Sequence, residues 1–135
     1  MREKLLQRVL LTACILILSG CGGEGGGLLA PQFQPQVANL TDNFQFQTTG
    51  VTNVTQTLQY TWQNTGTRAT IDQATVFTSG TATITLRDAA GAQMYTASLA
   101  QNGSFQSTAG QSGAWTIIVT VNNFNGTMNF RVQKL

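Results

Sequence analysis

Few residues in this 135-residue chain are of types that carry out chemistry. It contains no histidine, which removes the commonest general base and metal ligand. Beyond the N-terminal region the only aspartates are Asp42, Asp72 and Asp88. A glycosidase needs two carboxyl groups that face one bond, and calcium needs about six to eight oxygen ligands. One Asp with Asn and backbone oxygens keeps a calcium site open as an alternative, but we expect no enzyme and no cofactor.

Two cysteines and one serine complete the set of candidate nucleophiles. Cys14 lies within an uncharged apolar run and is interpreted there as a small hydrophobic residue. Cys21 lies three residues after the end of that run. Ser112, in the segment Gly110-Gln-Ser-Gly113, lacks the spacing of a nucleophile elbow and any histidine partner, so it is interpreted as a turn residue.

The N-terminal 20 residues have the pattern of a secretory signal peptide. Arg2, Lys4 and Arg8 precede residues 9–18, which are ten uncharged and mostly apolar residues. As a helix this run rises about 15 Å, whereas the hydrocarbon core of a bilayer is about 30 Å thick. We therefore expect residues 1–20 to be a leader and not a permanent transmembrane helix.

The end of this leader, Leu18-Ser19-Gly20-Cys21, resembles the lipobox of bacterial lipoproteins. The resemblance covers the first 21 residues and implies a diacylglycerol thioether on the Cys21 sulfur, with cleavage before Cys21. Two or more acyl chains anchor a protein stably in a membrane. Gly22, in place of the Asp that commonly retains such proteins in the inner membrane, implies the outer membrane, or the outer face of the plasma membrane in an organism with one membrane.

Residues 21–41 are predicted to be a tether between this anchor and a folded domain. The segment begins with Gly22-Gly-Glu-Gly-Gly-Gly27 and later contains Pro31 and Pro35, a composition typical of a flexible spacer. Residues 33–40 are also a candidate for a first edge strand. The domain itself is assigned to residues 42–135.

The mature chain is electrically neutral. It carries four acidic residues and four basic ones: Glu24, Asp42, Asp72, Asp88, Arg68, Arg87, Arg131 and Lys134. A neutral domain has no electrostatic footprint for nucleic acid. The expected partners are the membrane, through Cys21, and a protein or glycan of the cell envelope.

Apolar and polar residues alternate throughout the domain, which is the pattern of half-buried strands. The stripe Trp115, Ile117, Val119 and Val121 is the strongest example. Between residues 69 and 77 the alternation slips near Asp72–Gln73, which predicts a bulge or corner there. The pattern predicts about eight strands, at residues 42–48, 54–64, 68–72, 74–78, 81–88, 92–100, 104–108 with 114–122, and 127–133; whether 104–108 pairs separately is left open.

Strands at this spacing, separated by Asn- and Gly-containing turns, predict a single antiparallel β-sandwich. Residues 74–135 resemble the jelly-roll domains of secreted bacterial proteins, including pre-peptidase C-terminal-like modules. The resembling segments are Ser79-Gly80, Asp88-Ala-Ala-Gly91, Gly113-Ala-Trp115-Thr-Ile-Ile-Val119 and Gly126-Thr-Met-Asn-Phe-Arg-Val132. This resemblance implies an accessory or binding role and supplies no catalytic residue.

The aromatic residues separate into core and candidate ligand-facing positions. Trp62 and Trp115 are in phase with aliphatic neighbours and are predicted to be core. Phe124 lies in the predicted turn 122–126, and Tyr95 faces outward if its strand is reversed, so both are candidates for contact with a ligand. We therefore expect a non-enzymatic binding or structural lipoprotein, with a carbohydrate-binding module that uses exposed aromatics as the alternative.

Overall fold

The computed structural model describes residues 34–135, which form seven antiparallel strands and no helix. Among these residues, none forms a helix that is long and apolar enough to cross a membrane. The strands are β1 (Gln36–Leu40), β2 (Asn43–Asn64), β3 (Ala69–Gln73), β4 (Val76–Arg87), β5 (Gln93–Ser98), β6 (Gly103–Gln106) and β7 (Gly113–Lys134).

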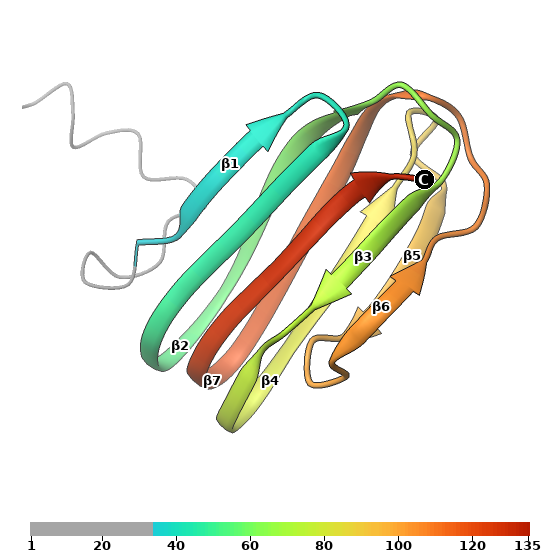
Figure 1. Ribbon diagram of the computed structural model, residues 1–135. Helices are drawn as coiled ribbons and strands as arrows, with labels where there is room; N and C mark the ends of the chain where they lie inside the picture. Colours follow the sequence, from blue (N-terminus) through green and yellow to red (C-terminus); the bar gives the residue numbers. More distant parts are fainter. Residues whose placement is uncertain (1–33) are drawn as a thin grey trace, which may run out of the picture.

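Two 22-residue strands, β2 and β7, pair along their length and bend together in the middle. The pairing shifts register between Thr48 and Gln56, and positive φ angles at Gly50, Asn53 and Asn123 occur in this bent region. Each strand therefore contributes one half to each of two layers (Figure 1). The predicted sandwich is confirmed, and its layers are connected by continuous strands.

The front sheet contains β1, residues 43–48 of β2, residues 127–134 of β7, β3 and β6, in that order. The back sheet contains residues 54–64 of β2, residues 113–122 of β7, residues 81–87 of β4 and β5. In Figure 1 the front sheet is the nearer layer, and the back sheet is drawn fainter.

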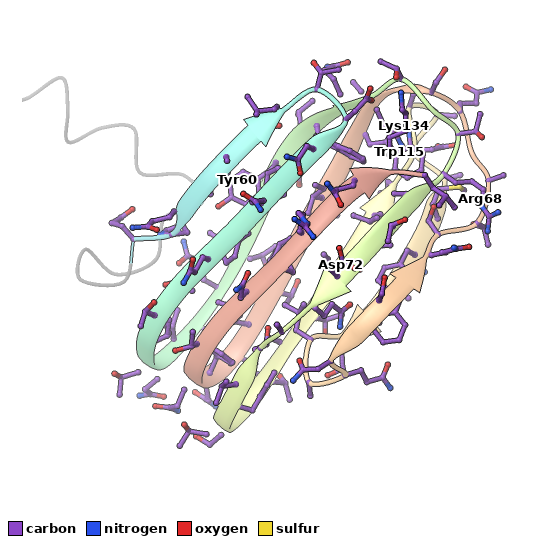
Figure 2. The ribbon with its side chains drawn as sticks, viewed as in Figure 1. Tyr60, Arg68, Asp72, Trp115 and Lys134 are labelled. Atoms are coloured by element: carbon purple, nitrogen blue, oxygen red, sulfur yellow. The ribbon has the colours of Figure 1, made fainter. Side chains whose placement is uncertain are left out.

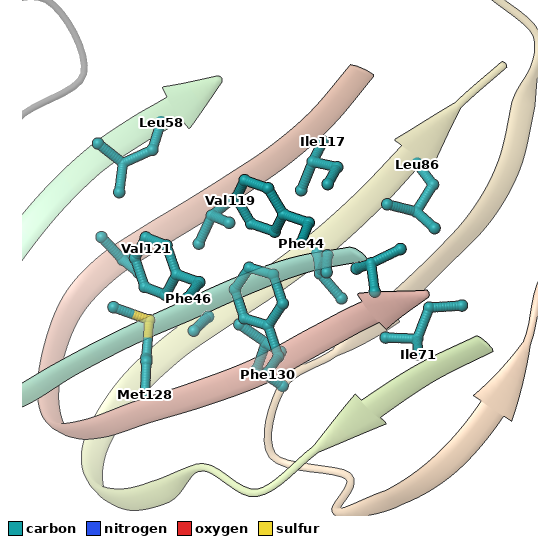
Figure 3. Packing of buried hydrophobic residues seen from close by; sticks show 14 of the residues in the cluster. Phe44, Phe46, Leu58, Ile71, Leu86, Ile117, Val119, Val121, Met128 and Phe130 are labelled. Atoms are coloured by element: carbon teal, nitrogen blue, oxygen red, sulfur yellow. The ribbon is translucent and has the colours of Figure 1, made fainter. Parts of the chain in front are cut away.

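The core lies between these sheets, as the alternation predicts. Phe44, Phe46 and Phe130 point inward from the front sheet and meet aliphatic residues of the back sheet (Figure 3). The rings of Phe46 and Phe130 stack at 5.0 Å between centroids. Trp62 and Trp115 are fully buried and meet edge to face at 6.0 Å, so their predicted core positions are confirmed.

Several predicted strand breaks are bends within longer strands. Residues 43–48 and 54–64 belong to β2, residues 76–78 and 81–87 to β4, and residues 114–122 and 127–133 to β7. The predicted turns at Ser79–Gly80 and 122–126 redirect the chain from one sheet to the other, while pairing resumes on both sides. Residues 103–106, in contrast, form the separate strand β6 that pairs with β3.

The predicted slip of alternation at Asp72–Gln73 is wrong. Ala69 and Ile71 are buried, and the same face continues inward with buried Gln73 and Thr75. The phase changes later, between Phe77 and Thr81, where β4 shifts register against β7 and Gly80 has a φ of 81°. The slip was predicted too early in the sequence because the pattern counts only apolar residues as buried. Gln73 and Thr75 are polar but buried.

The candidate edge strand within residues 33–40 is confirmed as β1, so the sheet begins at Gln36 and not at residue 42. All five β1 residues are exposed. Two side-chain bonds tie β1 to the back sheet: Asn39 Nδ2 donates to the Thr61 carbonyl at 2.8 Å, and Trp62 Nε1 donates to the Leu40 carbonyl at 3.1 Å. This strand thus bridges one open side of the sandwich.

Candidate ligand-binding face

The predicted site residues do not form one site. Cys21 and the lipobox lie outside the described residues 34–135. Phe124 was predicted to face a ligand, but this prediction is wrong because its side chain is 0% exposed. Its residue pairs with Val54 inside the bend, and its ring meets Phe77 edge to face at 5.1 Å. β2 and β7 stay paired through the bend, and the Phe124 ring is therefore directed into the core.

Tyr95 is half-buried and does not present a free ring. Its hydroxyl donates to Gln73 Oε1 at 2.8 Å, and its ring lies 6.4 Å from that of Phe105. Burial raises the pKa of the Tyr95 hydroxyl above its ordinary value. Phe124 and Tyr95 therefore form no exposed aromatic platform for a sugar.

Asp42 is held at the turn that joins β1 to β2. It accepts hydrogen bonds from the Thr65 N–H at 2.7 Å and the Thr65 hydroxyl, and it pairs with Lys134 at 3.0 Å. The Thr65 backbone bond is the main reason why the pKa of Asp42 is lowered. These contacts fix the turn, which contains a positive φ of 64° at Asp42.

Asp88 is buried and ordered by backbone N–H groups. Its carboxylate accepts from Gln111 at 2.9 Å, Ala90 at 3.0 Å and Ala92 at 2.9 Å. These donors, with Gln111 first, lower the pKa of Asp88. Asp42 and Asp88 thus have different partners. Within residues 34–135, no group of three His, Cys, Asp or Glu side chains is placed to hold a metal ion.

The third aspartate, Asp72, lies on the outer face of the front sheet, which is turned toward the viewer in Figure 2. Residues opposite one another on paired strands share a face, so the register defines rows across the sheet. The central row contains Ala38, Gln45, Arg131, Asp72 and Ser104. The flanking rows contain Leu40, Asn43, Gln133, Thr70 and Gln106 on one side, and Gln36, Gln47 and Asn129 on the other. We call this set the front face.

Arg131 and Asp72 form an ion pair at the centre of the front face, with 3.3 Å between Nη2 and Oδ2. Their side chains are 44% and 35% exposed. An exposed pair of this kind contributes about 0–1 kcal/mol to stability. The two opposite charges are therefore available to a ligand at a small cost to the fold.

A hollow of about 420 Å³ opens beside this ion pair and is the candidate site. Its lining residues come from four strands and the β3–β4 link: Gln45, Asp72, Gln73, Ala74, Gly103, Asn129 and Arg131. Two of them, Ala74 and Gly103, are small and lie where β3 ends and β6 begins. The small residues leave room beside the longer side chains of Gln45, Asn129 and Arg131.

The frame of the hollow is fixed by hydrogen bonds. The Ala74 N–H donates to the Asn129 carbonyl at 2.9 Å. Gln73 is 3% exposed, and its side chain donates to the carbonyls of Ser98 and Gln101 while it accepts from the Tyr95 hydroxyl. Because this side-chain amide is engaged at both its nitrogen and its oxygen, Gln73 connects β3 to the β5–β6 loop and holds the wall in place.

Comparisons with known proteins assign this chain to no family. No protein-family model matches the chain, and no curated protein matches it. A structure of accessory secretory proteins 1, 2 and 3 from Streptococcus pneumoniae is similar at 11% identity and a TM-score of 0.41, over 84% of this chain and 92% of that one. Procruciferin, an 11S globulin from Brassica napus, is similar at 10% identity and a TM-score of 0.39, over 80% of this chain and 27% of that one.

Proposed function

We propose that this protein is a lipid-anchored lipoprotein of the bacterial cell envelope and that its sandwich acts as a non-enzymatic binding module. The hollow in the front face is the observation that carries the binding role. It combines donors, acceptors and two opposite charges in a frame held by backbone pairing and by Gln73. Each of the three aspartates in the domain has its own partners, which supports binding over carboxylate catalysis.

The anchoring part of the proposal rests on Leu18-Ser19-Gly20-Cys21 and on the Gly-rich segment after it. Cys21 precedes the first residue of β1 by fifteen residues. A flexible chain of that length has an end-to-end distance of about 20 Å. Such a tether lets the front face turn toward material near the membrane.

The anchor is tested by Cys21→Ala, which removes the sulfur that would carry the lipid. We expect the wild-type protein to sediment with membranes and the variant to move to the soluble fraction. The intact mass of the wild-type protein should equal residues 21–135 plus acyl chains. An unmodified mass, or a variant that stays wholly with the membranes, contradicts the lipid anchor.

The binding role is tested by sedimenting the detergent-solubilised protein with isolated envelope fragments. Asp72→Asn combined with Arg131→Gln removes both charges from the front face and leaves the net charge unchanged. The matched control is Thr57→Gln with Thr120→Gln, a cross-strand pair on the outer face of the back sheet. We expect only the front-face variant to stay in the supernatant. Equal sedimentation of all three proteins contradicts a binding role for the front face.

A further inference from the structure

We infer that the hollow of the front face binds one residue of a neutral oligosaccharide through its hydroxyl groups, without aromatic stacking. This inference rests on the proposed binding role and specifies its ligand. The sequence suggested a sugar site on exposed aromatic rings. Because Phe124 is buried, we place the sugar site in the hollow instead.

The side chains around the hollow include both hydrogen-bond donors and acceptors. Gln45 and Asn129 each offer an amide that donates and accepts, Asp72 only accepts and Arg131 only donates. A sugar hydroxyl also does both. Neighbouring hydroxyls can therefore bridge the ion pair, one donating to Asp72 and the next accepting from Arg131, in charge-assisted hydrogen bonds.

Other ligand classes fit this site less well. Pockets for apolar molecules are lined mainly by hydrophobic and aromatic side chains, whereas the only apolar side chain here is that of Ala74. An anion would meet Asp72 beside Arg131, only 3.3 Å away. An extended peptide binds at a sheet edge or through apolar side-chain pockets, but β7, which carries Arg131, is an interior strand of the front sheet.

The rows of the front face extend beyond the hollow and suit a chain of sugars. The central row crosses five strands, which is a distance of about 19 Å at the usual strand spacing. Amide side chains lie in the flanking rows on both sides, including Gln47 and Gln133. An oligosaccharide placed along this row finds polar partners on both sides of the sugar in the hollow.

The test fills the hollow without removing a polar group. Ala74→Gln places a longer side chain in the space, and Ala114→Gln is the matched control because Ala114 is an exposed alanine on the outer face of the back sheet. The lipidated full chain in detergent is titrated by calorimetry with neutral hexasaccharides of β-1,4-glucose, α-1,4-glucose and β-1,4-N-acetylglucosamine. Thermal melts of each variant verify that the fold is intact.

We expect at least one hexasaccharide to bind, Ala74→Gln to weaken it tenfold or more, and Ala114→Gln to change it less than twofold. Equal affinities for the two variants overturn the assignment to the hollow. If no hexasaccharide binds while envelope sedimentation still depends on Asp72 and Arg131, the ligand class is wrong and the binding role stands. If sedimentation is also independent of these residues, both are wrong.

Discussion

The outer faces of the two sheets are both polar, but they differ in their commonest residues. The back face is dominated by threonine, in rows such as Thr57, Thr120, Thr83 and Ser98. Threonine is a strong strand former, and the Thr85 and Thr96 hydroxyls also bond across strands at 3.0 Å. The front face instead carries Gln, Asn, Asp and Arg, although Asn and Asp are depleted in strands.

The preference of threonine for strands explains the composition of the back face. The same preference does not explain the composition of the front face. Threonine on the back face supports the sheet on which it lies. Asn129 and Asp72 on the front face are of residue types depleted in strands, and they line a hollow next to Arg131. A face that departs from strand preference is the one to search for a ligand.

The largest expected effect comes from breaking the core that both faces share. Trp115 is fully buried, packs on Trp62 and donates its indole N–H to the Gln111 carbonyl at 2.7 Å. Trp115→Ala should lower the free energy of unfolding by about 3–5 kcal/mol. Urea denaturation followed by circular dichroism measures this loss. An unchanged midpoint would contradict the core position of the ring.

A second effect concerns the loops and depends on pH. The N–H donors around Asp88 lower its pKa from the ordinary value of 3.8, so the unfolded chain takes up a proton first as the pH falls. The stabilisation is therefore complete above about pH 4 and is lost as the pH falls through the lower folded pKa. Asp88→Asn should lower the melting temperature at neutral pH and flatten its decline in acid.

Asp42 is a second carboxylate whose titration should affect stability in acid. Its pKa is also lowered, mainly by Thr65, so part of the acid sensitivity should remain in the Asp88→Asn variant. Melting curves between pH 2 and pH 7 decide the outcome. A variant with the same acid profile as the wild type would show that the Asp88 cradle contributes nothing to stability.

The smallest effects sharpen the comparison between the faces. Gln45→Thr with Asn129→Thr gives the front face a back-face composition, and should raise the free energy of unfolding by about 0.2–1 kcal/mol while abolishing envelope sedimentation. The reciprocal change, Thr85→Asn, should lower stability by about 1 kcal/mol and leave sedimentation intact. Loss of stability in the front-face variant would mean that its amides are structural.

The sequence predicts the local features of this fold well. Alternation correctly indicates the buried faces around Trp62 and Trp115, because period two is a property of each strand alone. Alternation does not correctly indicate the environment of Phe124 and Gln73 or the positions of the bends. At these places, pairing with distant segments determines which side chains are buried. A turn-like sequence such as 122–126 can reverse a chain or bend a paired strand, and only the register against β2 distinguishes the two.

The candidate site could not be predicted for the same reason. Gln45, Asp72 and Arg131 are recognisable as polar positions on their strands, but the order β2, β7, β3 brings together segments far apart in the chain. The size of the hollow depends on Ala74 and Gly103 beside those strands. Neither residue carries a signal for binding by itself.

The bridging strand β1 has a mechanical consequence. It begins at Gln36, which follows the proposed tether in the sequence, and its pairing with β2 ends at the Leu40–Asn43 pair. If the anchor holds one end and a ligand holds the front face, a pulling force reaches the domain through Gln36. We then expect the Gln36–Gln47 pair to separate first, and the bonds of Asn39 and Leu40 to the back sheet to separate last. The five residues of β1 would lengthen the tether under load before the core is strained.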